Sequence, residues 1–390
     1  MNMSDFIGAF IAMCAALVVV ILVHPKVIAF AKKHNIVDNP DARKLQRVPV
    51  PVMGGVAVYF GLAIGLCVAG LFMNIISMLP MFLAISIMLG VGVADDVSGL
   101  SPKLRFLIEI AITLLLMFWT KVALNDFQGL WGITAVPLWA SIPLTVVAVV
   151  GIINAINLVD GVDGLSSGYC IMASTAFAVL FYHSGDYLMI LLCLLSIGAM
   201  LPFFFHNVFG KKSKMFIGDG GSLMMGVVMS TFVAVAITSG GSCEKLVAEG
   251  VGIVPFTLAV MCVPVFDTVR VMTMRILRRT SPFNPDKTHL HHLFIELGYS
   301  HLGTTLSELL LNIVVIMAWF VAYKLGASVD VQFYVVMITG LLLTAGLYKF
   351  LRIQMSKNTA LYKIIQKIAR KSHFENNKSW ERLQKIVDYK

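Results

Sequence analysis

Long apolar segments recur along the whole chain and are separated by short stretches that hold most of the charged residues. A helix needs about 20 apolar residues to cross the hydrocarbon core of a bilayer. The pattern therefore predicts an all-α, polytopic integral membrane protein with about eleven transmembrane helices. The predicted segments are residues 4–30, 53–73, 77–94, 104–122, 138–158, 165–183, 187–205, 222–239, 253–277, 306–325 and 331–351.

Composition supports a membrane protein. Of the 390 residues, 58% are hydrophobic and 13% are charged, whereas roughly a quarter of the residues in soluble domains are charged. We find no repeat and no linker between domains, so residues 1–351 are expected to form one membrane-embedded domain. Residues 352–390 are expected to form a basic cytoplasmic tail. An amphipathic helix over residues 362–370 would anchor this tail at the membrane surface.

Lys and Arg residues are distributed unequally between the two sides of the predicted helices. The loops after odd-numbered segments hold fourteen of them, and the other side holds only Lys121, Lys245 and Lys324. Short loops rich in Lys and Arg stay in the cytoplasm, so the N-terminus is expected outside and the C-terminus in the cytoplasm. The first segment has no basic region or cleavage site before it and is expected to be retained. Topology and contact with anionic membrane lipids account for the net charge of +9, and no nucleic-acid partner is predicted.

The cysteines indicate neither a disulfide framework nor a zinc site. Five of the six lie inside apolar segments, Cys243 is alone in an outward loop, and no CxxC spacing occurs. The remaining candidates for functional residues are therefore the carboxylates and histidines.

Four polar clusters lie at the predicted inner ends of the helices. Carboxylates in or beside a membrane helix are costly and usually functional. All four clusters fall on the same side, although the loop assignment used only Lys and Arg. The clusters are residues 92–105 with Asp95 and Asp96, residues 154–165 with Asn157, Asp160 and Asp163, residues 216–222 with Asp219, and residues 278–292 with His289, His291 and His292.

Carboxylates, histidines and cations at an inner membrane surface suit the meeting of an anionic lipid headgroup with a soluble phosphate-bearing donor. Two unit charges about 4 Å apart repel by roughly 4 kcal/mol at an effective dielectric near 20. Aspartates alone would therefore repel both substrates. Magnesium, held by one or two carboxylates and by substrate oxygens, would neutralise this repulsion.

Each cluster also has a plain structural interpretation when it is considered alone. Adjacent aspartates after a helix often form a solvated cap, and Asp or Ser at a helix start is a common N-cap. Interfacial histidines need no ligand, and lysines in loops can serve topology only. The residues open to such interpretations are Asp95, Asp96, Asp160, Asp163, Asp219, Ser222, His289, His291, His292, Lys211, Lys212 and Lys214. For Asp267, an ion pair with Arg270 three residues later is the favoured interpretation.

In their order along the chain, the four clusters resemble the polyprenyl-phosphate N-acetylhexosamine-1-phosphate transferase family. The matching motifs are an Asp-Asp pair followed by Leu-Ser-Pro-Lys, then Asn-Leu-x-Asp-Gly-x-Asp-Gly-Leu, Phe-x-Gly-Asp-x-Gly-Ser and His-Leu-His-His. Residues 44–55 also resemble the first inward loop of this family. The box His289-Leu-His291-His292, in place of three consecutive histidines, is similar to the branch that uses UDP-N-acetylglucosamine.

The resemblance implies roles for individual residues. Asn157, Phe216 and Asn207 would hold the nucleoside, whereas Asp95 and Asp96 would flank the lipid phosphate. The catalytic residues implied are Asp95, Asp96, Asp160, Asp163, Asp219, His291 and His292. The substrate-binding residues implied are Lys44, Lys103, Asn157, Asn207, Phe216, Arg279 and His289. The metal ligands implied are Asp163 and Asp219.

The resemblance also implies the reaction. N-acetylglucosamine 1-phosphate would pass from UDP-GlcNAc to undecaprenyl phosphate, with magnesium as cofactor, for which manganese can substitute. The enzyme would lie in a bacterial cytoplasmic membrane with its active site on the cytoplasmic face. Another UDP-N-acetylhexosamine, a covalent two-step mechanism and a homodimer remain open alternatives.

Other classes of membrane protein fit less well. Secondary transporters place carboxylates near the bilayer midplane, whereas these aspartates lie at helix ends. An intramembrane aspartyl protease needs Gly-x-Gly-Asp, and position 216 is Phe. CDP-alcohol phosphotransferases need an Ala-Arg after Asp-Gly, which is missing after Asp160 and Asp163.

Overall fold

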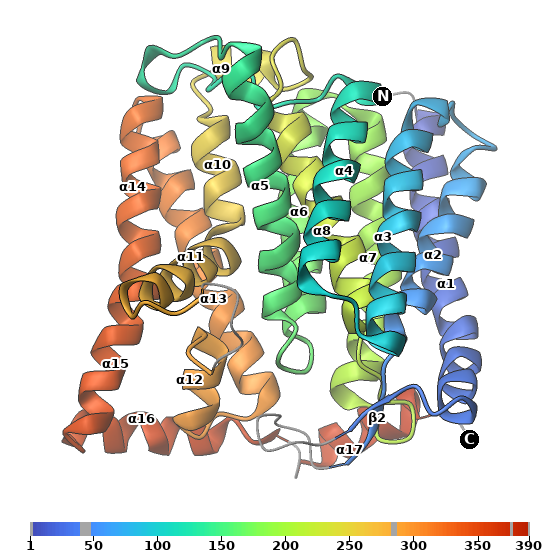
Figure 1. Cartoon of the computed structure of the whole chain (residues 1–390), viewed down its shortest axis with the longest axis vertical. Helices are drawn as coiled ribbons and strands as arrows, with labels where there is room; N and C mark the ends of the chain where they lie inside the picture. The colour runs from blue at the N-terminus through green and yellow to red at the C-terminus, as the bar shows by residue number, and fades with distance from the viewer. Residues whose placement is uncertain (1–2, 40–47, 282–286, 375–376, 389–390) are drawn as a thin grey trace.

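A computed structural model of the chain describes residues 3–39, 48–281, 287–374 and 377–388. Helices running along one common axis make up most of the molecule, and the last two helices lie across one end (Figure 1). The helices are α1 (Met3–Lys33), α2 (Gly54–Ala69), α3 (Leu79–Ser98), α4 (Pro102–Thr120), α5 (Leu138–Val159), α6 (Leu165–Ser184), α7 (Tyr187–Phe209), α8 (Gly218–Ile237), α9 (Glu244–Ala248), α10 (Ile253–Val260), α11 (Cys262–Leu277), α12 (Leu290–Glu296), α13 (His301–Lys324), α14 (Val329–Leu341), α15 (Leu347–Ser356), α16 (Ala360–Lys371) and α17 (Lys378–Val387).

The all-α prediction is confirmed, with small additions. Strands β1 (Val37–Asp38) and β2 (Val50–Pro51) form a two-stranded antiparallel pair. Short 3-10 turns occupy η1 (Ile76–Met78) and η2 (Leu130–Gly132), and a π-helical turn, η3 (Leu342–Gly346), joins α14 to α15. The predicted tail helix is present as α16, and the second tail helix, α17, was not predicted.

Helices occupy all eleven predicted places, but fewer are long and apolar enough to cross a membrane. In the described part of the chain eight helices meet that condition, or nine if the bent pair α10 and α11 is one span. Helix α2 has 16 residues, which is about 24 Å at 1.5 Å per residue against a core of about 30 Å. Helix α4 carries Lys103, Arg105 and Glu109 in its first half.

Helix α8 is the centre of the bundle. It contacts α2, α3, α5, α6 and α10, and 89% of its most apolar stretch is buried inside the molecule. Glycines allow this close packing at its N-terminal end. A Cβ atom on Gly55 of α2 would lie 2.3 Å from the Cα atom of Gly221, and one on Gly92 of α3 would lie 2.4 Å from the Cα atom of Gly220.

The predicted span over residues 253–277 is broken, because α10 and α11 meet at an angle of 74°. The break frees backbone groups that need partners inside an apolar medium. Asn312 of α13 supplies them: its Oδ1 accepts from Val263 N at 2.9 Å, and its Nδ2 donates to Val260 O at 3.0 Å. Tyr169 Oη also donates to Val260 O. Residues far away in the sequence therefore stabilise the bend.

We expect Asn312→Leu to destabilise the protein by about 2 kcal/mol or more, because it leaves buried backbone groups without partners. The measurement is the free energy of unfolding in detergent. Leu310→Ala, on the side of α13 where 60% of the leucine is exposed, is the control and should cost less. An Asn312→Leu protein as stable as this control would contradict the role given to Asn312.

Candidate active site

The first three polar clusters predicted from the sequence and the histidine box of the fourth lie at one end of the bundle, which is the lower end in Figure 1. Helices α3 and α5 end there with Asp95, Asp96 and Asn157, and α8 begins there with Asp219. Helix α12, which carries the histidine box, lies at the same end. Segments separated by more than 100 residues thus form one site, as the direct contacts below show.

Asp96 caps helix α8, although it belongs to α3. Its Oδ1 accepts from Asp219 N at 3.0 Å and its Oδ2 accepts from Gly220 N at 3.2 Å. A carboxylate at a helix N-terminus satisfies free N–H groups and is stabilised by the helix dipole. Gly218 has a φ of +73°, and a Cβ there would lie 2.5 Å from Asp96 Oδ2, so glycine is required. Asp96 therefore fixes where α8 begins.

Asp219 is oriented by Asn157. The Asn157 amide donates to Asp219 Oδ1 at 2.6 Å and to Ser222 Oγ at 2.8 Å. On the other side, Arg105 Nη1 lies 4.0 Å from Asp219 Oδ2. Asp219 thus has one oxygen held by an amide and the other facing a cation.

Arg105 connects Asp219 to the rest of the carboxylates. It forms an ion pair with Asp95 Oδ2 at 3.1 Å and lies 3.7 Å from Glu109 Oε1. Asp95 also accepts from Leu100 N at 2.7 Å, which closes the end of α3. Asn154 donates to Glu109 at 2.5 Å. The two neighbouring aspartates thus have different partners. Asp96 accepts hydrogen bonds from the backbone at the start of α8, and Asp95 forms an ion pair with Arg105.

The loop after α5 contains two aspartates in opposite electrostatic settings. Burial raises the pKa of Asp160 well above its usual range, and the charges of Asp219, Asp96 and Asp163 add to this rise. Burial also acts on Asp163, but the hydrogen bond from His301 and the charge of Lys214 outweigh it, so the pKa of Asp163 is lowered. Lys214 Nζ lies 2.6 Å and His301 Nδ1 lies 2.8 Å from Asp163 Oδ2.

The histidine box adjoins this loop. A Cβ on Gly161 would lie 2.6 Å from His291 Nε2, so His291 contacts the residue next to Asp160. The rings of His289 and His291 are stacked with their centroids 5.6 Å apart. His289 Nδ1 lies 2.9 Å from Asp267 Oδ2, and its Nε2 is buried without a hydrogen-bond partner in the described structure. The box therefore faces the carboxylates.

Asp267 does more than the predicted ion pair. Arg270 Nη2 lies 2.6 Å from Asp267 Oδ1, which confirms the pair. The second oxygen of Asp267 accepts from Leu290 N at 3.2 Å in addition to its contact with His289. Arg270 also donates to Thr288 O at 2.6 Å. Asp267 and Arg270 together fix the start of the histidine box.

The remaining predicted residues lie in different surroundings. Lys44 is outside the described residues. Lys103 and Arg279 are exposed, and in the described part of the chain no ion pair joins them to Asp95, Asp96, Asp160, Asp163 or Asp219. Phe216 is bridged to Val52, after β2, and flanks the start of α8. Asn207 is buried, and it accepts from Gly164 N at 2.6 Å and donates to Met215 O at 3.0 Å. Its predicted contact with uracil stays a prediction.

Sequence reasoning missed two partners of Asp163. Lys214 was interpreted as a topology determinant, and His301 was not singled out. No local spacing connects either residue to Asp163, because 51 and 138 positions separate them from it. The only available signal was a cation at the inner end of a helix, which many loop lysines share.

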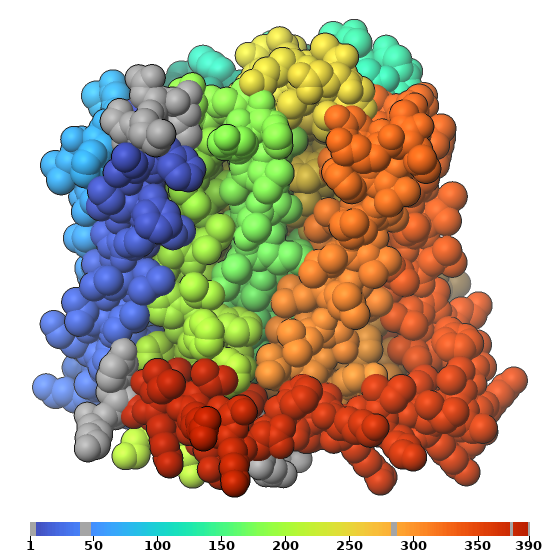
Figure 2. All heavy atoms as spheres, turned by 180° about the vertical axis from the view of Figure 1, so that it is seen from behind, coloured from blue at the N-terminus to red at the C-terminus, as the bar shows by residue number. Residues whose placement is uncertain are grey.

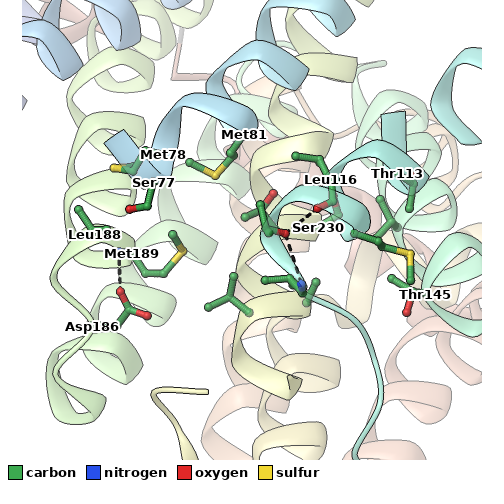
Figure 3. Close-up of a pocket in the computed structure, with 17 residues that line it drawn as sticks. Ser77, Met78, Met81, Thr113, Leu116, Thr145, Asp186, Leu188, Met189 and Ser230 are labelled. Carbon is green, nitrogen blue, oxygen red and sulfur yellow. Dashed lines mark hydrogen bonds between the residues drawn. The ribbon is translucent and has the colours of Figure 1, made fainter. Parts of the chain in front are cut away.

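A separate cavity of about 210 Å³ lies toward the opposite ends of the same helices (Figure 3). It is lined near the start of α3 and α7 and near the end of α4 and α8, by residues such as Met78, Met189, Thr120 and Val235. The lining residues that the structure describes include no Lys, Arg or His. This cavity therefore does not have the chemistry of a phosphate site.

The carboxylate cluster has the donor chemistry of a hard divalent cation, for which carboxylate oxygens are the preferred ligands. Asp163 Oδ1 is buried and has no hydrogen-bond partner in the described structure. Asp160 lies beside it, where burial and then the charges of Asp219, Asp96 and Asp163 raise its pKa. Among the described residues no three His, Cys, Asp or Glu side chains form a ready-made metal site. A bound magnesium ion would take further ligands from substrate oxygens or from water.

Comparison with known proteins finds similar sequences over most of the chain. Residues 78–238, from the start of α3 to the end of α8, match the model for glycosyl transferase family 4. The chain is 28% identical over 292 residues to a Bacillus subtilis protein named probable undecaprenyl-phosphate N-acetylglucosaminyl 1-phosphate transferase, which covers 75% of this chain and 78% of that protein. Over these residues the chain is similar to glycosyl transferase family 4.

Two further relatives have the same kind of name. The undecaprenyl-phosphate alpha-N-acetylglucosaminyl 1-phosphate transferase of Escherichia coli K12 is 28% identical over 277 residues, covering 69% of this chain and 72% of that protein. The protein of that name from Yersinia pestis is 29% identical over 280 residues, with the same coverage. The chain thus has the helices of a multi-pass membrane protein and is similar to transferases of the polyprenyl-phosphate N-acetylhexosamine-1-phosphate type.

We expect Gly92→Ala to cost about 1–3 kcal/mol of folding free energy, because an added methyl group would overlap the start of α8. Its Cβ would lie 2.4 Å from the Asp219 backbone, whereas a Cβ on Gly90 would meet nothing within 4 Å. Gly90→Ala is therefore a matched control and should be neutral or slightly stabilising. Denaturation in detergent measures both, and equal stabilities would contradict the close contact between α3 and α8.

Stability should fall as the pH drops below about 6.5, the ordinary pKa of histidine. Burial lowers the pKa of His291 well below that value, and the charges of His292 and His289 lower it further. The unfolded chain then binds a proton that the folded protein does not bind, so unfolding becomes easier in acid. His291→Asn should flatten the dependence of the unfolding midpoint on pH. His183→Asn, at an exposed histidine, should not, and equal slopes in all three proteins would refute the assignment.

Proposed function

We propose that this protein transfers N-acetylglucosamine 1-phosphate from UDP-GlcNAc to undecaprenyl phosphate. The products would be UMP and undecaprenyl-pyrophosphoryl-GlcNAc, the first membrane intermediate of a cell-surface polysaccharide. The observation that carries the proposal is the convergence of Asp219, Asp160, Asp163 and the His289–His292 box at one end of the bundle. The names of the relatives support the choice of donor and acceptor.

In the proposed reaction an oxygen of the lipid phosphate attacks the β-phosphorus of the UDP-sugar, and the bond from that phosphorus to the UMP oxygen breaks. A phosphate monoester has a second pKa near 6 and is mostly dianionic at neutral pH. It needs little help from a base, so direct attack is favoured over a covalent aspartyl intermediate. Asp95 would then orient the acceptor through Arg105, with which it is paired.

The proposed magnesium ligands are Asp163 and Asp219, with Asp160 beside them. The chemistry that magnesium supplies when bound is neutralisation of charge between two phosphate-bearing substrates. The protein contributes the orientation of its own groups. Asn157 holds Asp219, and Lys214 with His301 holds Asp163 Oδ2 so that Oδ1 stays available.

The histidine box is proposed to bind the phosphates and the sugar. His289 is held through Nδ1 by Asp267, and its buried Nε2 has no protein partner in the described structure. Because Nδ1 donates its hydrogen to Asp267, Nε2 can donate a hydrogen bond to a phosphate oxygen when the imidazole is positively charged. The abundance of Lys and Arg at this end of the bundle supports a cytoplasmic active site.

We expect purified protein in detergent to release UMP when it is given magnesium, UDP-GlcNAc and undecaprenyl phosphate. Asp219→Asn should reduce the rate at least about 100-fold, as removal of a group that stabilises transition-state charge does. Asp330→Asn is the control, because Asp330 accepts a hydrogen bond from Trp131 N and belongs to the first turn of α14, far along the chain from the cluster.

A panel of UDP-sugar donors in the same assay distinguishes this function from transfer of another sugar and from transport. Release with another UDP-N-acetylhexosamine but not with UDP-GlcNAc would keep the chemistry and correct the sugar. Silence across the panel, together with counterflow of a solute, would replace the transferase with a secondary transporter.

A further inference from the structure

The C-terminal strap, meaning α16, Ser372, α17 and Asp388, crosses the end of the bundle that holds the carboxylates. Figure 2 shows it as a red band along the lower edge of the molecule. It continues from α15, runs past the start of α13 and reaches the end of α7, which α17 contacts. A basic amphipathic tail could lie anywhere on a membrane surface, so its two specific attachments need an explanation.

The first attachment joins Ser372 to the start of α13. Ser300 N donates to Ser372 Oγ at 3.0 Å, and Ser300 Oγ donates to Ser372 O at 2.6 Å. Ser300 and Ser372 are both buried. Gly303 makes the approach possible, since a Cβ there would lie 2.4 Å from Ser372 Oγ. The residue after Ser300 is His301, which lies against Asp163.

The second attachment joins α17 to the loop between α7 and α8. Val387 packs with Val208 and Phe209, and the Trp380 ring lies 4.7 Å from the Phe209 ring. These apolar contacts bring the C-terminal end of α17 to the loop, where Asp388 follows.

Asp388 accepts hydrogen bonds from three consecutive backbone N–H groups. The donors are Lys211 and Lys212 at 3.0 Å and Ser213 at 2.9 Å, and Ser213 Oγ adds a bond of 2.8 Å. Successive N–H groups that converge in this way form an anion-binding nest. Burial alone would raise the pKa of Asp388, but these bonds lower it. The residue after the nest is Lys214, which also lies against Asp163.

The two cations that hold Asp163 Oδ2 therefore each follow directly on a residue that the strap binds. We propose that the C-terminal strap positions Asp163 for the reaction by fixing the backbone that presents His301 and Lys214. Asp388 and Ser372 are positioning residues in this scheme and touch no substrate. The proposal rests on the proposed function, since it assigns a structural support to a residue of that site.

The contact of Asp388 with the loop is expected to order the loop without adding much to global stability. The loop over residues 210–217 has few backbone bonds of its own, and the three N–H groups can bond to water if Asp388 is removed. Global stability should then change little, while the local order of the loop falls. Lys214 would spend less time against Asp163, and misplacement of a reacting group by about 1 Å can cost 100-fold in rate.

The test compares Asp388→Ala with Glu381→Ala in the full-length protein. Glu381 is an exposed carboxylate on the same helix, so the control removes the same charge outside the nest. Hydrogen–deuterium exchange of residues 208–217 should be faster in Asp388→Ala than in wild type and unchanged in Glu381→Ala. UMP release should fall about tenfold only in Asp388→Ala. Unchanged exchange in Asp388→Ala would overturn the proposal.

A double-mutant cycle supplies the second readout. If Asp388 acts through Lys214, then Asp388→Ala combined with Lys214→Met should lose no more activity than Lys214→Met alone, because both changes act on the same carboxylate. Losses that multiply would overturn the proposal and leave α17 as a surface anchor. The exchange measurement needs no substrate. If exchange is faster in Asp388→Ala but wild type releases no UMP, the proposed function is refuted, and the binding of the loop by the C-terminal strap is supported.

Discussion

The start of helix α8 is the constraint on which the rest of the structure depends. Three helices approach it, and glycines on α2, α3 and α8 itself leave no room for side chains between them. The carboxylate of Asp96 lies at this helix start and accepts from Asp219 N and Gly220 N. The same contact that lets the central helix pack tightly thus fixes the backbone of Asp219. The packing of the core and the geometry of the site therefore depend on the same contact.

The carboxylates around this point are kept apart by different partners. Asp96 is bonded to backbone N–H groups, Asp95 to Arg105, Asp163 to Lys214 and His301, and Asp160 is left among negative charges. Like charges at such distances can coexist only if each is compensated separately. The carboxylates that lack a positively charged partner mark the place where a cation and phosphate-bearing substrates are proposed to bind. There the cation, and not the protein, would balance the negative charge.

Irregular backbone in the membrane serves the same end. The break between α10 and α11 turns α11 away from the bundle axis and brings Asp267 and Arg270 to the histidine box. An unbroken helix would have to continue along the bundle. Asn312 and Tyr169 form hydrogen bonds with the backbone groups that the break leaves without helical partners. Two polar residues in apolar helices therefore support a site that they do not touch.

The sequence by itself determined the places of the apolar helical segments, the side on which the polar clusters gather, and the ion pair of Asp267 with Arg270. Those features follow from local spacing, because apolar length and a three-residue separation on a helix act between neighbours in the chain. Tertiary structure alone decided that Asp96 caps a helix beginning 122 positions later, and that Lys214 and His301 share Asp163. It also decided that Asp388, directly after α17, binds the backbone of the loop before α8. Each of these contacts depends on which helices become neighbours when apolar surfaces are buried, and burial is not directional, so no short motif encodes them.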